Sequence, residues 1–166
     1  MSISAEVFRE VFAAHYDDLT RFVHRRSRSD HAEDVVEEAF LTLWRQRTMP
    51  AQVRPWLFAT ARNLLLNAER GRQRQEALAV RIAETSDTVV PDHAAGSDAR
   101  LDVIASWRTL PAADQEVLAL AIWEELSPAE AAMVLGCSKA TYLMRLSRAK
   151  ARLAPRLTRA RLSTVL

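Results

Sequence analysis

The residues with the clearest chemical potential stand near the C-terminus, where hydrogen-bond donors recur along one predicted helix. Thr141, Arg145, Arg148 and Arg152 are separated by three or four residues, so they share one helical face. Arginine and threonine side chains can donate hydrogen bonds to the base edges and phosphates of a major groove. This donor-rich face predicts that the chain binds duplex DNA.

The residues around this face have the pattern of a helix-turn-helix. Ser127 and Glu130 form a capping box, and Pro128 stands at the first helical position, where its missing N–H group costs nothing. Gly136 can adopt the left-handed conformation that ends this first helix, and Ser138 can cap the second. The second helix also carries an apolar stripe, which we expect to be its packing face: Tyr142, Leu146, Ala149 and Leu153.

Basic residues are concentrated locally, although the whole chain is nearly balanced at 23 Lys and Arg against 21 Asp and Glu. The segment from Arg145 to Arg161 holds seven basic residues and no acidic one. A second basic cluster consists of Arg70, Arg72 and Arg74. Either cluster alone is compatible with a solvated helix face, but two clusters beside predicted helices favour a nucleic-acid partner.

A second unusual surface precedes the Arg70–Arg74 cluster. Trp56, Thr60, Asn63 and Asn67 share one stripe at helical spacing. An aromatic ring can stack on an unpaired base, and amides can hydrogen-bond to base edges. The stripe predicts a single-strand contact, with the alternative that Trp56 is simply half-buried core.

Acidic residues are concentrated on the segment that begins at residue 32. Asp34, Glu37 and Glu38 lie on one exposed side of the predicted helix, at spacings that place like charges close together. Such pairs repel by a few tenths of a kcal/mol. Two interpretations remain open, a solvated face and a docking face for a basic partner.

The sequence predicts no catalytic, cofactor-binding or metal-ligating residues. The four histidines have no ligand spacing with one another or with Cys137, and three scattered glycines cannot form a phosphate-binding loop. A single cysteine suits a reducing compartment. No apolar run approaches the ~20 residues of a membrane span, and the first residues lack a signal-peptide pattern. We therefore expect a cytoplasmic protein without a membrane or a small-molecule substrate.

Helical periodicity and the absence of strand-like alternation predict an all-α fold of two small helical domains. The stretch around Pro91 and Gly96 is mildly acidic and lacks periodicity, which is typical of a flexible linker. We expect a first domain over residues 1–80, a linker over 81–100, and a second domain over 101–166 that contains the helix-turn-helix.

Three stretches, in this order, resemble the extracytoplasmic-function (ECF) group of bacterial RNA polymerase sigma factors. Residues 32–44 (AEDVVEEAFLTLW) are similar to the polymerase-binding helix of sigma region 2. Residues 54–64 (RPWLFATARNL) are similar to the helix that leads into −10 recognition. Residues 110–153 are similar to region 4, which binds the −35 element. The resemblance implies a region 2-like domain followed by a region 4-like domain.

The resemblance also implies a function without catalysis. A sigma factor binds core RNA polymerase, directs it to promoter DNA and assists promoter melting; a candidate further partner is an anti-sigma factor. The implied polymerase-binding residues are Asp34, Glu37 and Glu38. The implied −10 contacts are Trp56, Asn63, Asn67, Arg70 and Arg72. The implied −35 contacts are Ser138, Lys139, Thr141, Arg145 and Arg148, with Arg145 on a base and Arg148 on a phosphate.

Two other functions stay open from the sequence. One is a helix-turn-helix regulator that binds duplex DNA as a dimer without polymerase, and the other is an anti-sigma-binding adaptor that has lost DNA affinity. A regulator should bind a palindromic duplex alone, and an adaptor should bind no DNA. A sigma factor should need core polymerase and prefer an asymmetric promoter.

The chain departs from the family pattern at several positions. Glu37 stands where the family usually has Gln, and Asn67 where it often has Asp. Leu143 and Met144 replace a usual Lys-Ser pair on the second helix of the helix-turn-helix. If either reaches the groove, it can meet only a thymine methyl or a sugar, because neither donates a hydrogen bond. The alternative is that Leu143 packs against the preceding helices or polymerase.

Overall fold

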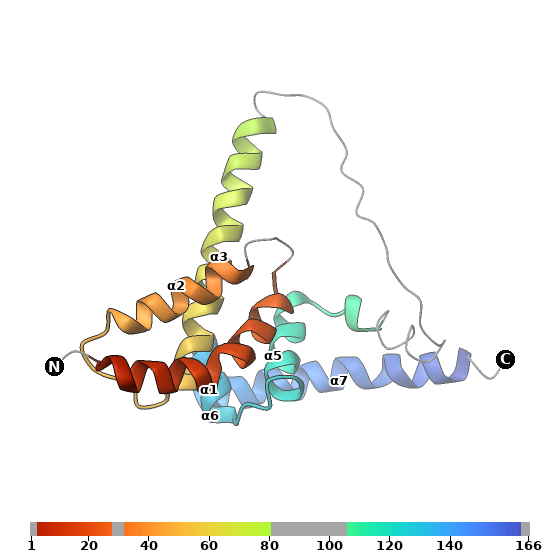
Figure 1. Ribbon diagram of the computed structural model, residues 1–166. Helices are drawn as coiled ribbons and strands as arrows, with labels where there is room; N and C mark the ends of the chain where they lie inside the picture. Colours follow the sequence, from red (N-terminus) through yellow and green to blue (C-terminus); the bar gives the residue numbers. More distant parts are fainter. Residues whose placement is uncertain (1–2, 28–31, 81–105, 164–166) are drawn as a thin grey trace. The chain divides into compact units, whose positions relative to one another are not determined.

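The computed structural model describes residues 3–27, 32–80 and 106–163, and the regular structure in these ranges is entirely helical (Figure 1). The long helices are α1 (Ala5–His24), α2 (Ala32–Trp44), α3 (Val53–Val80), α5 (Ala112–Ile122), α6 (Pro128–Leu135) and α7 (Lys139–Ser163). The predicted all-α fold class is confirmed.

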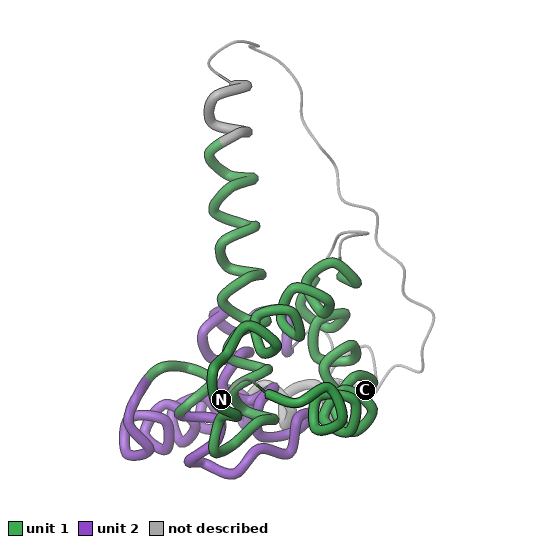
Figure 2. Tube along the Cα trace, turned by 60° about the vertical axis from the view of Figure 1, so that its left-hand side comes forward, with its two compact units in different colours: residues 1–86, 133–136 green, residues 87–132, 137–166 purple. Residues whose placement is uncertain are grey.

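The chain divides into two compact units, as predicted (Figure 2). One unit comprises residues 1–86 with 133–136, and the other comprises residues 87–132 with 137–166. The predicted linker over 81–100 lies outside the described residues. The exact domain limits therefore stay a prediction.

In the first unit, α1, α2 and α3 pack around a common core. Phe22 of α1 stacks on Phe58 of α3 with ring centroids 4.5 Å apart. Apolar side chains from all three helices complete this core. Besides Phe22 and Phe58, the fully buried ones are Leu19, Val23, Ala39, Leu43, Leu57 and Ala61.

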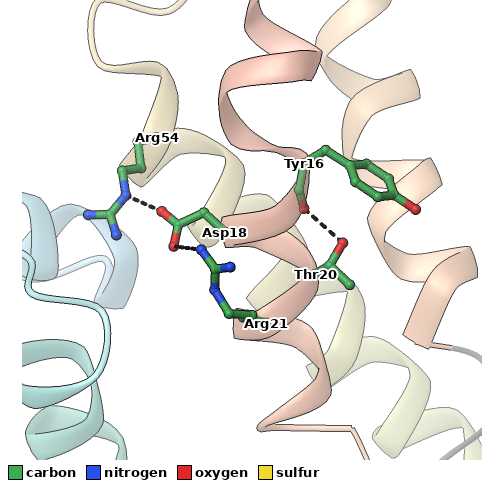
Figure 3. Close-up of polar contacts among 5 residues, drawn as sticks. All are labelled: Tyr16, Asp18, Thr20, Arg21 and Arg54. Carbon is green, nitrogen blue, oxygen red and sulfur yellow. Dashed lines mark hydrogen bonds and ion pairs between the residues drawn. The ribbon is translucent and has the colours of Figure 1, made fainter.

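An ion pair also ties α1 to α3. Arg54 donates a hydrogen bond from Nε to Asp18 Oδ2 at 2.6 Å, and Arg21 lies 3.6 Å from the same carboxylate (Figure 3). Burial alone would raise the pKa of Asp18, but the hydrogen bond and charge of Arg54, with a smaller contribution from Arg21, hold it below its usual value. Asp18 therefore stays ionised and fixes the start of α3 against α1.

In the second unit, α7 packs on α5 through the stripe predicted from the sequence. Ala149 is fully buried with Leu118, and Leu146 and Leu153 pack against the same cluster. Tyr142 is 1% exposed, and its hydroxyl donates to the Val117 carbonyl oxygen at 3.3 Å. Burial, with a smaller contribution from Cys137, raises the pKa of Tyr142. This stripe determines which side of α7 faces away from the core.

The local signals of the helix-turn-helix are all confirmed. Glu130 N donates to Ser127 Oγ at 3.3 Å, and Ser127 N donates to Glu130 Oε2 at 2.8 Å, which is the predicted capping box. Gly136 has φ +63°, a left-handed conformation that costs glycine little. Thr141 N donates to Ser138 Oγ at 3.1 Å, so Ser138 caps α7.

We expect Asp18→Asn to lower the free energy of unfolding by about 1–2 kcal/mol near neutral pH, because the partly buried Arg54 loses a charged acceptor. Since the pKa of Asp18 is lower in the folded state, its stabilisation is present above the unfolded pKa and is lost as pH falls through the folded value. Urea denaturation followed by circular dichroism between pH 7 and pH 3 measures both effects.

The matched control is Asp17→Asn, since Asp17 is the exposed neighbour of Asp18 on α1. This variant should unfold like the wild type and keep its acid sensitivity. Equal stability of Asp18→Asn and wild type at pH 7 would show that the ion pair contributes nothing measurable.

Candidate nucleic-acid interface and acidic docking face

The predicted −35 contacts lie on the first three turns of α7. Lys139, Arg145 and Arg148 are all exposed. Ser138 and Thr141 bond to each other through their hydroxyls at 2.8 Å, and Ser138 also caps the helix. Their oxygens thus hold the helix start together, while the basic side chains supply charge for DNA.

Arg152, the last member of the donor-rich face, has a structural partner. Its Nη1 donates to Asp114 Oδ2 on α5 at 2.6 Å, and the Asp114 side chain is only 12% exposed. Removing such a partner leaves a nearly buried carboxylate without its counter-charge. The structure therefore places Arg152 in the packing of α7 on α5, whereas the sequence pattern grouped it with the DNA-facing arginines.

Leu143 and Met144 both lie on the surface of α7, with 43% and 47% of their areas exposed. Leu143 is therefore not buried against any described helix, and the interpretation that it packs against the preceding helices is wrong. Two apolar side chains stand beside the exposed basic ones on this helix.

The predicted −10 contacts lie along one face of α3. Trp56 is partly exposed, and Asn63 and Asn67 follow it at helical spacing and are exposed. Arg70 continues this face and donates from Nη1 to Asn67 Oδ1 at 3.3 Å. The bond makes the Asn67 oxygen an acceptor and orients its amide group. Four of the five predicted −10 residues are thus brought together.

Arg72 does not join this face. It points to another side of α3, where Nη2 lies 2.7 Å from Glu69 Oε1 and Nε donates to Glu69 Oε2. Arg74 follows Arg70 by four residues and donates to the Arg70 carbonyl oxygen at 3.2 Å, so it extends the −10 face instead. Helical spacing alone could have predicted this difference, because residue 74 lies one turn after residue 70 on the same face, whereas residue 72 lies on another side of the helix.

The acidic residues of α2 form the predicted exposed face. Asp34 and Glu37 are exposed, and Glu38 is partly exposed. Arg45, just past the end of the helix, donates from Nη1 to Glu38 Oε1 at 2.9 Å and offsets part of the charge of Glu38. All four acidic residues of α2 lie in its first two turns.

Two apolar residues that the sequence reasoning missed extend this acidic face. Leu41 and Trp44 are 45% and 43% exposed, and each follows an acidic residue by three, four or seven positions. The Trp44 ring meets Phe8 of α1 edge-on at 4.9 Å, so its orientation is fixed. Their position off the buried stripe of α2 is the signal that could have found them.

The described ranges contain no group of three or more His, Cys, Asp or Glu residues able to hold a metal ion. No helix within these ranges is long and apolar enough to cross a lipid bilayer.

Comparison with known families matches both halves of the chain. Residues 11–75 match the Sigma-70 region 2 model, and residues 101–153 match the model of Sigma-70, region 4. Together the two matches cover more than half of the 166 residues. A comparison with curated protein sequences gives no match.

Solved structures share the fold. The sigma factor RpoE, in a co-crystal structure with the anti-sigma factor NepR from Bartonella quintana, superposes with a TM-score of 0.67 at 26% identity. That match covers 91% of this chain and 96% of RpoE. CnrH, solved in complex with the cytosolic domain of CnrY, gives a TM-score of 0.61 at 23% identity over 93% of this chain and 90% of CnrH.

A region 2 module followed by a region 4 helix-turn-helix defines a transcription initiation factor. The chain belongs to the sigma-70 family and is a sigma factor of the ECF type. Its partners are core RNA polymerase and promoter DNA.

We expect Arg152→Gln to destabilise the second unit by about 1–3 kcal/mol, because it removes the charged partner of a nearly buried carboxylate. Hydrogen exchange of the α5 and α7 amides measures this local effect. Arg148→Gln, an exposed arginine one turn earlier, is the matched control and should change protection little. Unchanged exchange in Arg152→Gln would return Arg152 to the candidate DNA contacts.

Proposed function

We propose that residues 1–80 bind core polymerase and the −10 element, that residues 101–166 bind the −35 element, and that residues 81–100 link the two. The observation that carries this proposal is the order of the two family matches, region 2 before region 4, around the unmatched stretch 76–100. Two weak DNA contacts on one chain gain effective concentration when both engage.

The acidic face of α2 is the proposed polymerase-docking surface. Asp34 and Glu37 supply exposed negative charge, and Glu38, which is paired with Arg45, lies at its border. Leu41 and Trp44 give the same surface an apolar part. The acidic side chains can attract a basic partner over a distance, and the exposed apolar side chains can be buried once that partner docks.

The face of α3 is the proposed −10 contact. Trp56 can stack on an unpaired base, and Asn63 and Asn67 can hydrogen-bond to its edge. Arg70 orients Asn67 and adds positive charge near the strand. Arg72, which pairs with Glu69 on another side of α3, is proposed to contribute only through its charge.

The start of α7 is the proposed −35 contact. Lys139, Arg145 and Arg148 lie exposed along its first three turns. We assign Arg145 to a base edge and Arg148 to a phosphate, because Arg148 stands one turn further along the helix. Ser138 and Thr141 position the helix start through their mutual hydrogen bond and stand next to the backbone of the DNA.

The remaining parts of the proposal follow from the family. Sigma factors in general are not enzymes, and we propose that this chain has no catalysis of its own and acts in the cytoplasm, where polymerase and promoters are found. Because the similar RpoE was solved with an anti-sigma factor, we also propose an anti-sigma factor as a partner. The dimeric regulator is not favoured, since it does not account for the region 2 match over residues 11–75.

We predict that Asp34→Arg abolishes co-purification with core polymerase and run-off transcription. Charge reversal at a docked pair replaces attraction by repulsion and costs about 2–5 kcal/mol. The measurement is co-purification of the tagged chain with core enzyme, followed by transcription from a pool of genomic fragments. Its control is Glu10→Arg, an exposed acidic residue on α1, which should retain both activities. Normal assembly of Asp34→Arg would leave this face merely solvated.

We predict that Asn63→Ala and Asn67→Ala impair transcription from double-stranded promoters far more than from templates already melted across the −10 element. Hydrogen bonds from the two asparagines to the edge of an unpaired base offset the free-energy cost of unstacking that base, and the alanine variants lose these hydrogen bonds. Permanganate reactivity of −10 thymines reports promoter opening. Gln73→Ala, on an exposed position of α3 that bonds to Glu69, should open the promoter like the wild type. If both asparagine variants open the promoter as the wild type does, the face of α3 that carries Asn63 and Asn67 has only a structural role.

A further inference from the structure

The outward side of α7 carries no charge along its centre. Ala140, Met144, Ser147 and Ala151 follow one another at spacings of four, three and four residues, and all four are exposed. With 100° of rotation per residue, this side lies opposite Tyr142 and Ala149, which pack on α5. Leu143 borders it. We call Ala140, Leu143, Met144, Ser147 and Ala151 the outer stripe.

The composition of the outer stripe favours close approach to another molecule. Ala140, Ser147 and Ala151 are small, so a partner can come near the helix backbone. Met144 and Leu143 project from this low surface and are the large apolar side chains exposed among the described residues of α7. Met144 lies near the centre of the stripe, and Leu143 lies at one edge.

Both edges of the outer stripe carry positive charge. Lys139 and Lys150 stand on the side of Leu143, and Arg145 and Arg148 stand on the other side. No acidic residue occurs between Lys139 and the end of α7. An uncharged centre between two cationic edges complements a major groove, in which base edges lie between two phosphate backbones. The same arrangement would repel a basic protein partner.

Apart from Arg145, which is assigned to a base edge, few other groups at the start of α7 are placed to read bases. The hydroxyls of Ser138 and Thr141 bond to each other, and Ser138 Oγ also accepts a hydrogen bond from the Thr141 backbone N–H. Arg152 pairs with Asp114. The outer stripe therefore occupies the position at which a helix inserted in a groove meets the bases.

We propose that Met144, with Leu143 beside it, is a specificity-determining contact that recognises thymine methyl groups in the −35 element. This inference rests on the proposed −35 role of α7 and goes further by naming the chemistry that is read. The thymine C5-methyl is the apolar group that the major groove presents, and a thioether or isobutyl side chain can bury it.

The test exploits the single-methyl difference between thymine and uracil. The full chain with core polymerase first selects −35 sequences from a randomised library, and selection of thymine at one or more positions is expected. Each selected thymine is then replaced by deoxyuridine, and holoenzyme affinity is measured. Burial of one methyl corresponds to about 0.8 kcal/mol, so each contacted position should lose roughly threefold to fivefold in affinity.

Substitutions on α7 test which side chain contacts the thymine methyl group. Met144→Ser should bind thymine and deoxyuridine equally at the position that Met144 contacts. Leu143→Ser should lose the thymine preference at an adjacent position and keep it at the position that Met144 contacts. Met133→Ser removes an equally exposed methionine from α6, 43% exposed, and should keep the full thymine preference. Circular dichroism checks that all variants fold.

The outcomes separate this inference from the proposed function. Holoenzyme that initiates with a −35 preference but shows no loss on deoxyuridine overturns the inference alone. A thymine preference that survives unchanged in Met144→Ser does the same, and loss of core binding in that variant would assign the stripe to a protein partner. A chain that directs no initiation from any promoter overturns both.

Discussion

The rotation of α7 about its own axis determines every contact that this helix can offer. Two interactions with α5 fix that rotation: the buried Tyr142, whose hydroxyl donates to the Val117 carbonyl oxygen, and the Arg152–Asp114 ion pair ten residues further along α7. Ten residues correspond to a net rotation of about 80°, so the two contacts hold neighbouring sides of the helix against α5. A turn of 100°, the angle between neighbouring residues, would expose the apolar packing stripe and bring charged residues from the flank of the helix against α5. The DNA-facing side is thus defined by what packs on α5.

The same principle operates in the first unit, with different chemistry. The Phe22–Phe58 stack and the Asp18–Arg54 ion pair attach the first turns of α3 to α1. Arg54 also lies 4.9 Å above the Phe58 ring, so the ionic and aromatic contacts form one cluster. Beyond this anchored part, α3 continues to Val80, and its polar side chains from Asn67 to Arg74 are exposed. A rigid start and a polar extension suit a helix that must hold out a row of side chains toward a nucleic-acid strand.

Features encoded over three or four residues could be predicted from the sequence, and features that depend on distant partners could not. The capping box, the left-handed Gly136 and the packing stripe of α7 are local patterns with a direct mechanical cause, and the structure confirms them. Arg152 has an acceptor 38 residues earlier, which no periodicity reveals. Arg72 is a different case, because its partner Glu69 is only three residues away and the pairing could have been recognised. Exposed apolar residues such as Leu41 become visible only once the buried side of the helix is known.

The distribution of charge connects these faces to selectivity. The chain carries a formal charge of only +2, yet α2 holds four acidic residues and no basic one, and α7 holds eight basic residues and no acidic one. Each phosphate neutralised by Lys or Arg strengthens binding to all DNA alike and makes it more sensitive to salt. A Leu-Met pair in place of the Lys-Ser pair usual in the family removes one such positive charge from α7. If the outer stripe reads methyl groups, this exchange lowers the sequence-independent part of the affinity while adding a base-dependent part. The ratio of specific to non-specific binding, which decides how promoters compete with the rest of a genome, then rises without any gain in total affinity.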